Sequence, residues 1–193
     1  MIVASVVHSL LTRKEPNLLY SDVLKYIFPT SIAIVVLKLA VEHLRLICAH
    51  AESTYPFECC GLLLGRNSQD GKTSVEVVAT QNAWSTSSVE SFQAIDASLD
   101  ADANQNSHYT IAPEEMLRVQ KQARDRQLDI IGIYHSHPDH PAIPSEFDRL
   151  CAWQSYSYII VSVPQGTSGE LLCWCLDDNH QFQPQEMIVS KLI

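Results

Sequence analysis

The chain has 193 residues, enough for one well-cored domain and too few for two ordinary ones. Apolar residues make up 46% and charged residues 18% of it, which is a globular rather than a disordered composition. Thirteen basic against twenty-two acidic side chains give a formal charge of −9 at pH 7. This balance argues against nucleic acid and against an anionic membrane surface as partners.

Cysteine usage and hydropathy bear on the compartment. The six cysteines form no C-x-x-C pair, so a four-thiolate zinc site has no scaffold, and a reducing compartment is expected. The most membrane-like stretch, Val23–Ala40, is interrupted by Lys25, Pro29 and Lys38, whereas a spanning helix needs about 20 apolar residues. The apolar opening residues lack the flanking signals of a secretory leader. We therefore expect a cytoplasmic protein.

Residues 1–30 differ in character from the rest of the chain. They combine a short apolar start, a polar turn and a Pro-Thr-Ser break at 29–31. We treat residues 1–30 as an N-terminal extension of unknown order and expect the folded domain over residues 31–193.

From about residue 31 the chain alternates strand-like and helix-like patterns. Strands are predicted at Ile32–Val36, Cys60–Leu64, Thr73–Thr80, Asp129–Tyr134, Tyr158–Val163 and Leu171–Leu176, the second and third joined across the Asp70-Gly71 turn. Helices are predicted at Leu37–Ala51, at Pro113–Arg126 and from Ser145 onward. Residues 81–107 are polar and irregular, with Phe92 and Ile95 as expected anchors. The alternation predicts an α/β (α+β) architecture with a mixed central sheet flanked by helices.

One segment carries a pattern with chemical meaning. His135-Ser136-His137-Pro138 is followed, six residues later, by Ser145-Glu146-Phe147-Asp148. On a strand, residues two apart point to the same side, so His135 and His137 can present two imidazoles together. Asp148 lies near the start of the next helix, on one face with Ser145. Two imidazoles and a carboxylate are a usual ligand set for a catalytic zinc ion, with water in the fourth position.

A purely local role for these residues is also possible. Ser145 with Asp148 fits a helix N-cap with an acid at the third helical position, a role compatible with catalysis. On its own, a His-x-His on a strand is more often structural than metal-binding. The full combination, however, should arise by chance in roughly one chain in 10⁵, which favours the metal site.

The segment resembles the signature of the JAMM (MPN-plus, Mov34/MPN/PAD-1) metalloproteases, which cut peptide or isopeptide bonds after ubiquitin-like proteins. The family's upstream motif, Glu-x-x-Gly-x-Leu-x-Gly, is matched in full by the stretch from Glu58 to Gly65. The resemblance covers residues 31–193 and implies a cytidine-deaminase-like MPN/JAMM fold.

The resemblance also implies roles for five residues. His135, His137 and Asp148 would hold one Zn²⁺ per chain, and Glu58 would be the general base that takes a proton from zinc-bound water. Ser145 would supply a hydroxyl to the developing oxyanion. Zinc can lower the pKa of its water from 15.7 to about 7, which suits a neighbouring carboxylate as proton acceptor.

Alternatives come from the same residues. His135-x-His137-x-Asp139-His140 also fits the H-x-H-x-D-H motif of metallo-β-lactamase-like enzymes, but only 53 residues follow His140 and His180 is the one further histidine among them. A catalytically silent MPN scaffold is a second alternative. Such a chain would be expected to lack one or more of the five residues, and all five are present here.

The substrate is inferred only by analogy. Between Asp148 and the strand at Tyr158 there is one cysteine, Cys151, and no histidine, unlike deubiquitinating members with a Cys/His-rich insertion. The compact chain and the Glu-Cys-Cys-Gly sequence are similar to bacterial members that act on small β-grasp sulfur-carrier proteins. We therefore expect such a carrier, ending in Gly-Gly, as substrate, and a groove beside the zinc that accepts its extended tail. The oligomeric state is left open.

Overall fold

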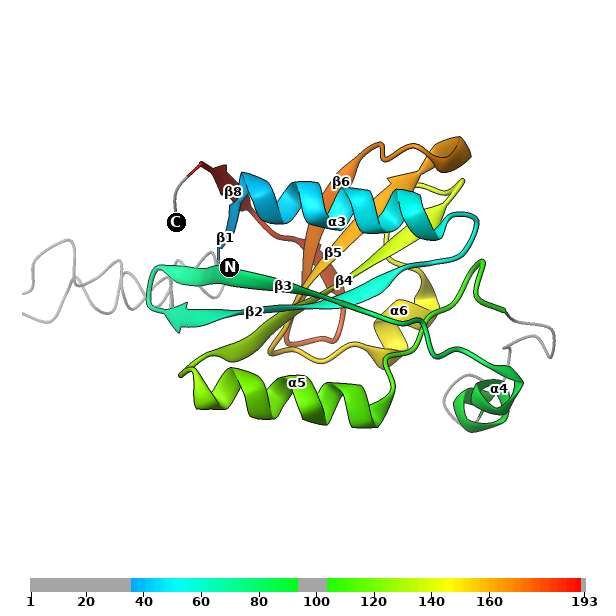
Figure 1. Cartoon of the computed structure of the whole chain (residues 1–193), viewed down its shortest axis with the longest axis horizontal. Helices are drawn as coiled ribbons and strands as arrows, with labels where there is room; N and C mark the ends of the chain where they lie inside the picture. Colours follow the sequence, from blue (N-terminus) through cyan, green and yellow to red (C-terminus); the bar gives the residue numbers. More distant parts are fainter. Residues whose placement is uncertain (1–35, 94–103, 192–193) are drawn as a thin grey trace, which may run out of the picture. The chain divides into compact units, whose positions relative to one another are not determined.

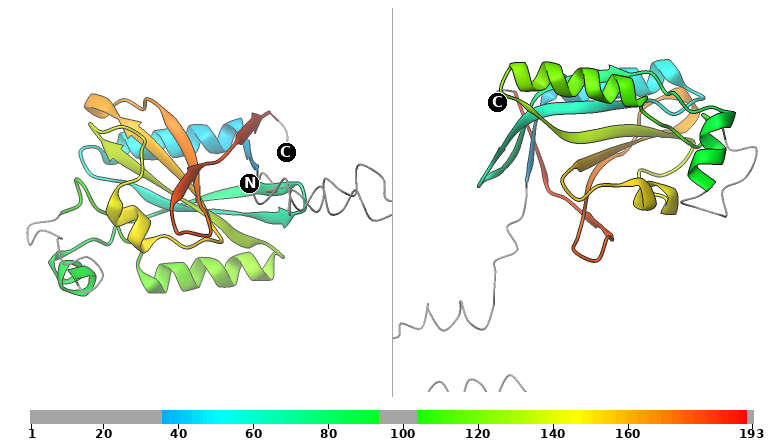
Figure 2. Two further views of the ribbon diagram at one scale, coloured as in Figure 1. Left: turned by 180° about the vertical axis from the view of Figure 1, so that it is seen from behind. Right: turned by 90° about the horizontal axis from the view of Figure 1, so that it is seen from below.

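A computed structural model of the chain describes residues 36–93 and 104–191. These residues form a mixed eight-stranded sheet in the order β7-β6-β5-β4-β2-β3-β1-β8. Helix α3 lies along one face of the sheet and α5 along the other, as the views in Figures 1 and 2 show. The predicted mixed sheet flanked by helices is thus confirmed. Residues 1–30 lie outside the described residues, so the domain boundary at residue 31 stays a prediction.

Eight strands and four helices make up the described part of the chain. The strands are β1 Leu37–Ala40, β2 Cys60–Ser68, β3 Gly71–Thr80, β4 Asp129–Pro138, β5 Ser157–Val163, β6 Leu171–Leu176, β7 Phe182–Pro184 and β8 Met187–Ser190. The helices are α3 Val41–Thr54, α4 Thr86–Gln93, α5 Pro113–Asp125 and α6 Glu146–Cys151, with a 3₁₀ turn at Pro164–Gly166.

The beginning of the domain corrects one prediction. Residues 37–40, expected to start a helix, form β1, and the helix α3 begins at Val41. Leu37 and Leu39 are fully buried, with half-buried residues between and after them, which is the period of a strand. β1 is held by parallel pairing to β3 and β8, which are distant in sequence. Local spacing cannot reveal such pairing. The predicted strand at Ile32–Val36 lies, apart from Val36, outside the described residues.

The centre of the sheet agrees with the sequence. β2 and β3 form the predicted antiparallel hairpin, with Gly71 at φ +115° after the turn. β4 pairs antiparallel with β2 and parallel with β5. It runs beyond the predicted end at Tyr134 through the two histidines and stops at Pro138, because proline cannot continue the ladder of backbone hydrogen bonds.

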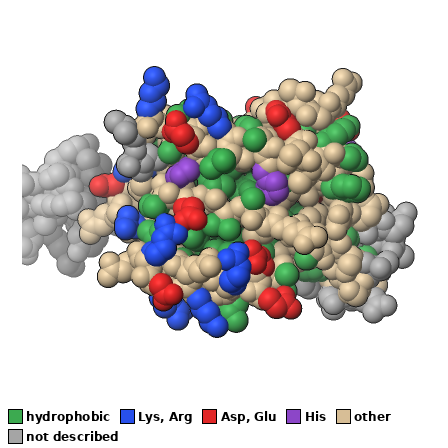
Figure 3. Space-filling view, in the orientation of Figure 1, with side chains coloured by type: hydrophobic (Ala, Val, Ile, Leu, Met, Phe, Trp, Pro, Cys, Tyr) green, Lys and Arg blue, Asp and Glu red, His purple; other side chains and the backbone are tan. Residues whose placement is uncertain are grey.

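The two faces of the sheet have separate cores. Ile47 and Ala51 of α3 pack with Leu63 and Tyr134 on one face. On the other face, Val119 and Ala123 of α5 pack with a group that includes Leu62, Leu64 and Leu128. Successive leucines of β2 therefore serve opposite layers. In Figure 3, Lys and Arg side chains are mixed with Asp and Glu side chains over the outer surface around α5.

Several local features lie around these cores. The helix predicted from Ser145 is α6, and α4 lies within the stretch expected to be irregular. Phe92 packs against Trp84 and Val89 as an anchor, whereas Ile95 lies outside the described residues. β7 and β8 were not predicted. All six cysteines are free thiols. Among the described residues, no helix has the length and apolar character needed to cross a bilayer.

Candidate metal centre

The two histidines of the motif lie side by side at the carboxyl end of β4. His135 and His137 point to the face that carries α5 and α6, and both are buried. Ser136, between them, points to the α3 face, where its Oγ accepts a hydrogen bond from the backbone N–H of Cys59 at 2.8 Å. The alternation expected of a strand therefore places the two imidazoles together.

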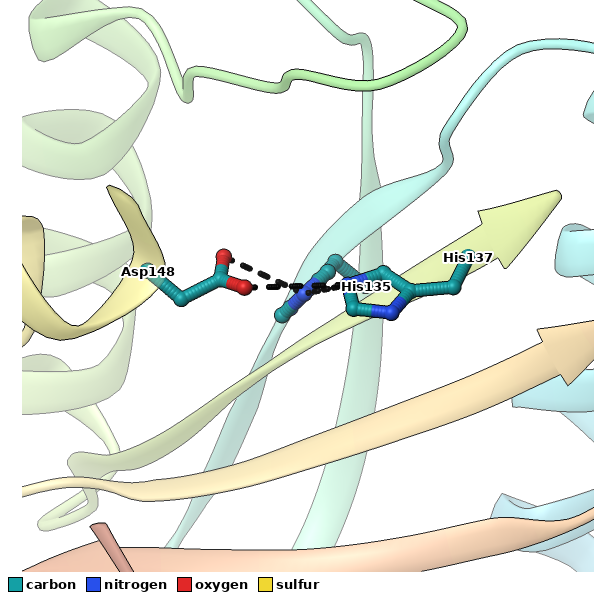
Figure 4. Close-up of side chains that lie close together, drawn as sticks. All are labelled: His135, His137 and Asp148. Carbon is teal, nitrogen blue, oxygen red and sulfur yellow. Dashed lines mark hydrogen bonds and ion pairs between the residues drawn. The ribbon is translucent and has the colours of Figure 1, made fainter. Parts of the chain in front are cut away.

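Asp148 completes the group from the neighbouring helix α6. Figure 4 shows its carboxylate turned toward both imidazoles. The Nε2 atoms of His135 and His137 are 3.0 Å apart. Asp148 Oδ1 lies 3.3 Å from His135 Nε2, and Asp148 Oδ2 lies 3.6 Å from His137 Nε2. The sequence thus predicted the three members of a real spatial cluster.

These separations fit a single cation. In a tetrahedral site with ligands at about 2.0–2.1 Å, neighbouring ligand atoms lie about 3.3–3.4 Å apart. The three observed separations fall on both sides of that value. A neutral imidazole and an ionised carboxylate are the forms that bind metal. Burial lowers the pKa of His135, which favours the neutral ring. Burial opposes ionisation of Asp148, but the nearby His135 and hydrogen bonds from its neighbours outweigh it and hold the pKa of Asp148 well below its usual range.

Ser145 holds the Asp148 carboxylate in place. Its backbone N–H and its hydroxyl both donate to Asp148 Oδ2 at 2.7 Å, and its Oγ accepts from the Asp148 backbone N–H at 3.1 Å. This is the reciprocal capping box at the start of α6 that the sequence suggested. The predicted local role is therefore correct. It leaves Oδ1 of Asp148 free of the cap and facing His135.

The surroundings of the two imidazoles differ. His137 Nδ1 lies 2.9 Å from the carbonyl oxygen of Pro141, a contact that fixes the ring with Nε2 free to bind a metal. His135 Nδ1 is buried and has no hydrogen-bond partner among the described residues. The ring of Tyr109 stacks on His135 at a centroid distance of 4.5 Å, so packing holds that ring. Nothing in the sequence pattern singled out Tyr109.

Glu58 reaches the site through the register of β2. Cys60 pairs with His135 across the antiparallel ladder, and the Ser136 backbone N–H donates to the Cys59 carbonyl at 3.2 Å. Continuing this register by two residues places Glu58 opposite His137, on the same face. Glu58 is only 5% exposed, and no hydrogen bond ties its carboxylate to another described residue. Burial, with the negative charge of Asp148, raises the pKa of Glu58 well above its usual range.

A cavity of about 300 Å³ brings these groups together. Glu58, His137, Ser145 and Asp148 line this central cavity, and the exposed His140 stands at it as well. The structure therefore places four of the five predicted site residues on one cavity wall. The fifth, His135, lies behind them in contact with His137 and Asp148.

Steric crowding explains why position 61 of the upstream motif is a glycine. It pairs with Tyr134, and a Cβ added at Gly61 would lie 2.3–2.5 Å from three atoms at the hydroxyl end of the Tyr134 side chain. The Tyr134 hydroxyl in turn lies 2.8 Å from His50 Nδ1. Only glycine leaves room for this ring on the α3 face of the sheet. We call the opposite face, to which His135 and His137 point, the metal face.

Cys59 and Cys60 are both fully buried, because both faces of the sheet are covered. Burial raises the pKa of their thiols to about 12 and about 11. Neither therefore has the properties of a thiolate nucleophile.

Comparison with known proteins identifies the family. Prokaryotic homologs of the JAB domain match residues 40–176, more than half of the chain, so the chain belongs to this family. The predicted JAMM-type family is thus confirmed.

Two similar proteins are desampylases. That of Pyrococcus furiosus is 27% identical over 84 residues, which cover 42% of this chain and 56% of the relative. That of Haloferax volcanii is 37% identical over 59 residues, which cover 30% of this chain and 42% of the relative. The chain thus spans about half the length of the curated relatives it matches.

A solved structure agrees with the fold. The solution structure of a protein from Desulfitobacterium hafniense gives a TM-score of 0.64 at 24% identity. The match covers 81% of this chain and 94% of that one. At this identity the likeness concerns the fold alone.

Proposed function

We propose that the protein is a zinc-dependent hydrolase, a metallopeptidase or isopeptidase that cleaves a peptide or isopeptide bond at the C-terminus of a ubiquitin-like or sulfur-carrier protein. One observation carries the proposal: two imidazoles and a carboxylate converge at 3.0–3.6 Å, with the buried Glu58 on the wall of the same cavity. Family membership supports it.

His135, His137 and Asp148 would hold the zinc ion, one per chain. When bound there, zinc would polarise the substrate carbonyl and lower the pKa of a coordinated water to about 7. Two neutral imidazoles and one carboxylate leave the ligand set at −1, so with Zn²⁺ the centre is formally +1. A positive centre suits a transition state in which negative charge develops on oxygen.

Glu58 is the proton carrier in this proposal. Its carboxylate takes a proton from the attacking water and delivers it to the nitrogen of the departing amine. The C–N bond breaks, a carboxylate is left on the carrier tail, and the amine leaves. Since no hydrogen bond to a described residue holds the carboxylate of Glu58, it can exchange a proton without breaking an internal contact.

Ser145 would donate to the developing oxyanion. In the structure its hydroxyl proton is directed to Asp148 Oδ2. The hydroxyl must therefore turn from Asp148 to the substrate during reaction. The backbone N–H of Ser145 also donates to Oδ2, so the carboxylate keeps one hydrogen bond when the hydroxyl turns.

A second cavity supports an extended substrate tail. This apolar cavity, of about 450 Å³, shares Tyr109, Phe147 and Asp148 with the central cavity. Most of its lining side chains are aliphatic or aromatic, among them Met116 of α5, Ile133 of β4 and Trp153 after α6. We assign it to the carrier tail before the scissile bond. Similarity to two desampylases favours a ubiquitin-like carrier.

The test uses the full chain, loaded with zinc, and sulfur-carrier proteins that bear an adduct on the C-terminal Gly-Gly. Intact mass spectrometry should show loss of the adduct, and a chelator should abolish it. A silent MPN scaffold predicts binding of the carrier with no change of mass. Cleavage that persists at the same rate after the metal has been removed would overturn the proposal.

A further inference from the structure

A third cavity, of about 410 Å³, borders Glu58 on the side away from the apolar cavity. Its wall comes from the end of α3, the residues on either side of Glu58, the end of β3 with Gln81 and Asn82, and Gln105. Glu58 lines both this polar cavity and the central cavity, and it does not line the apolar cavity. The three cavities thus succeed one another, with the candidate metal centre in the middle.

Most side-chain hydrogen-bond donors around the polar cavity are used inside the protein. The Ser53 and Thr54 hydroxyls donate to the His50 carbonyl, each at 2.9 Å, and the Thr80 hydroxyl donates to the Cys60 carbonyl at 3.0 Å. These three hydroxyl protons are therefore already committed.

Two of the three amides on the wall, Asn82 and Gln105, are committed in the same way, whereas the exposed amide of Gln81 is not. Asn82 Nδ2 donates to the carbonyls of Glu58 and His108, at 3.1 and 3.0 Å. Gln105 Nε2 donates to the carbonyls of Asn82 and Trp84, at 3.1 and 2.9 Å. An amide nitrogen has two protons, so neither side chain has one left for a ligand.

Apart from the exposed Gln81 amide, what remains on the wall is mainly acceptor capacity. A hydroxyl oxygen that has donated its proton still has lone pairs, and Gln105 Oε1 makes no hydrogen bond to a described residue. Asn82 Oδ1 already accepts from the Trp84 and Thr110 N–H groups. Of the described residues on this wall, none is Lys or Arg, and Glu58 is the one carboxylate. With Glu58 as its one charged group and more free acceptors than donors, the described wall favours a ligand rich in N–H donors over an anion.

The position of Glu58 indicates how the substrate is oriented across the three cavities. In the proposed hydrolysis Glu58 returns its proton to the departing nitrogen, so the amine half of the substrate must lie on the side that Glu58 borders. The acyl half then lies toward the apolar cavity. The product on the Glu58 side is an amine, which becomes an ammonium group, a donor-rich cation.

Building on the proposed function, we propose that the polar cavity binds the leaving-amine half of the substrate and selects residues with cationic or N–H-rich groups over acidic ones. The specificity of the enzyme then comes from two chemically different sides. An apolar cavity receives the carrier tail and an acceptor-rich cavity receives the group that is released.

The experiment compares adducts on a single carrier, each a single amino acid joined through its α-amine to the terminal glycine. Lysine, glutamine, methionine and glutamate vary the charge at similar length, and intact mass gives kcat/KM. We expect lysine to exceed glutamate by at least about tenfold, with the neutral residues between them.

Two substitutions of opposite charge at Gln81 test whether the polar cavity is where the leaving-amine half binds. Gln81 is exposed, lines the polar cavity, and its side chain makes no hydrogen bond to a described residue. Gln81→Lys should reduce or reverse the preference for lysine, and Gln81→Glu should increase it. Gln181→Lys adds the same charge at another exposed glutamine that lines none of the three cavities, and it should leave the ratio unchanged.

The outcomes separate the two proposals. If no adduct is released by the zinc-loaded chain, the proposed function fails. If all four adducts are released at equal rates, or if Gln81→Lys and Gln181→Lys change the ratio equally, hydrolysis stands and the assignment of the polar cavity is overturned.

Discussion

The two faces of strand β4 show how one element can serve both stability and chemistry. On the α3 face, Ser136 Oγ bonds the Cys59 backbone and the Tyr134 hydroxyl contacts His50. On the opposite face, neither His135 Nδ1 nor the buried carboxylate of Glu58 has a hydrogen-bond partner among the described residues. These polar groups on the α3 face thus have hydrogen-bond partners, whereas those on the opposite face remain available to bind a metal or exchange a proton.

The difference indicates which face of the strand holds polar groups that lower the stability of the fold. Buried polar groups without partners destabilise a protein, and natural proteins accept such conflicts mainly at functional sites. Substitutions on the metal face should therefore change metal binding and catalysis, whereas substitutions on the α3 face should change the free energy of unfolding.

The largest effect should come from the metal face. His137→Ala removes one of three ligands, so the zinc content should fall from about one per chain to near zero. Hydrolysis should fall by about 10⁴-fold or more, since the metal contributes several kcal/mol to the transition state. Metal analysis and intact mass measure the two quantities. His140→Ala removes an exposed imidazole from the same cavity and should keep the metal; unchanged zinc content in His137→Ala would contradict the ligand assignment.

Glu58→Gln separates proton transfer from metal binding. The amide has nearly the same shape but cannot accept the proton of the water, so hydrolysis should fall by about 10²–10⁴-fold while the zinc content stays at about one per chain. Cleavage at the normal rate would mean that another group is the base.

On the α3 face, Gly61→Ala should act on stability alone. The added methyl group meets the Tyr134 side chain at 2.3–2.5 Å, and overpacking of this kind costs about 1–3 kcal/mol. Urea unfolding measures the loss, and zinc content should be unchanged in the folded protein. Combining Gly61→Ala with Tyr134→Leu relieves the clash, so the double variant should lose less than the two single losses added together. Full additivity would speak against this contact.

The smallest effect concerns pH. Since burial raises the pKa of Glu58, the folded state keeps its proton at pH values where the unfolded chain, with a pKa of about 4.3, has lost it. Glu58 therefore lowers stability as the pH rises above that value. Metal-free Glu58→Gln should unfold at a higher temperature than the metal-free parent at pH 7, and the difference should shrink toward pH 4. A difference in unfolding temperature that grows as the pH falls would mean that folding lowers the pKa of Glu58.

Sequence reasoning reached the site more completely than the fold around it. The alternation of a strand and the spacing of a helix start are local, so His135, His137, Ser145 and Asp148 could be placed from the motif. Glu58 needed the resemblance, because its approach to His137 depends on the β2–β4 register, a long-range property. β1 was predicted as helix for the same reason, since its ladder joins residues far apart in the chain.

Other contributors left no local signal. Tyr109 stacks on His135, and Asn82 ties the Glu58 carbonyl to the segment that carries Tyr109. Both lie in or beside a stretch that composition marks only as polar and irregular. Their roles depend on where that stretch crosses the end of the sheet.

The most direct test of a single cation held by these side chains is X-ray absorption at the zinc edge of the loaded protein. We predict only nitrogen and oxygen neighbours at about 2.0–2.1 Å, with two imidazoles among four ligands. A sulfur neighbour at about 2.3 Å, or no imidazole scattering, would contradict the assignment of His135, His137 and Asp148.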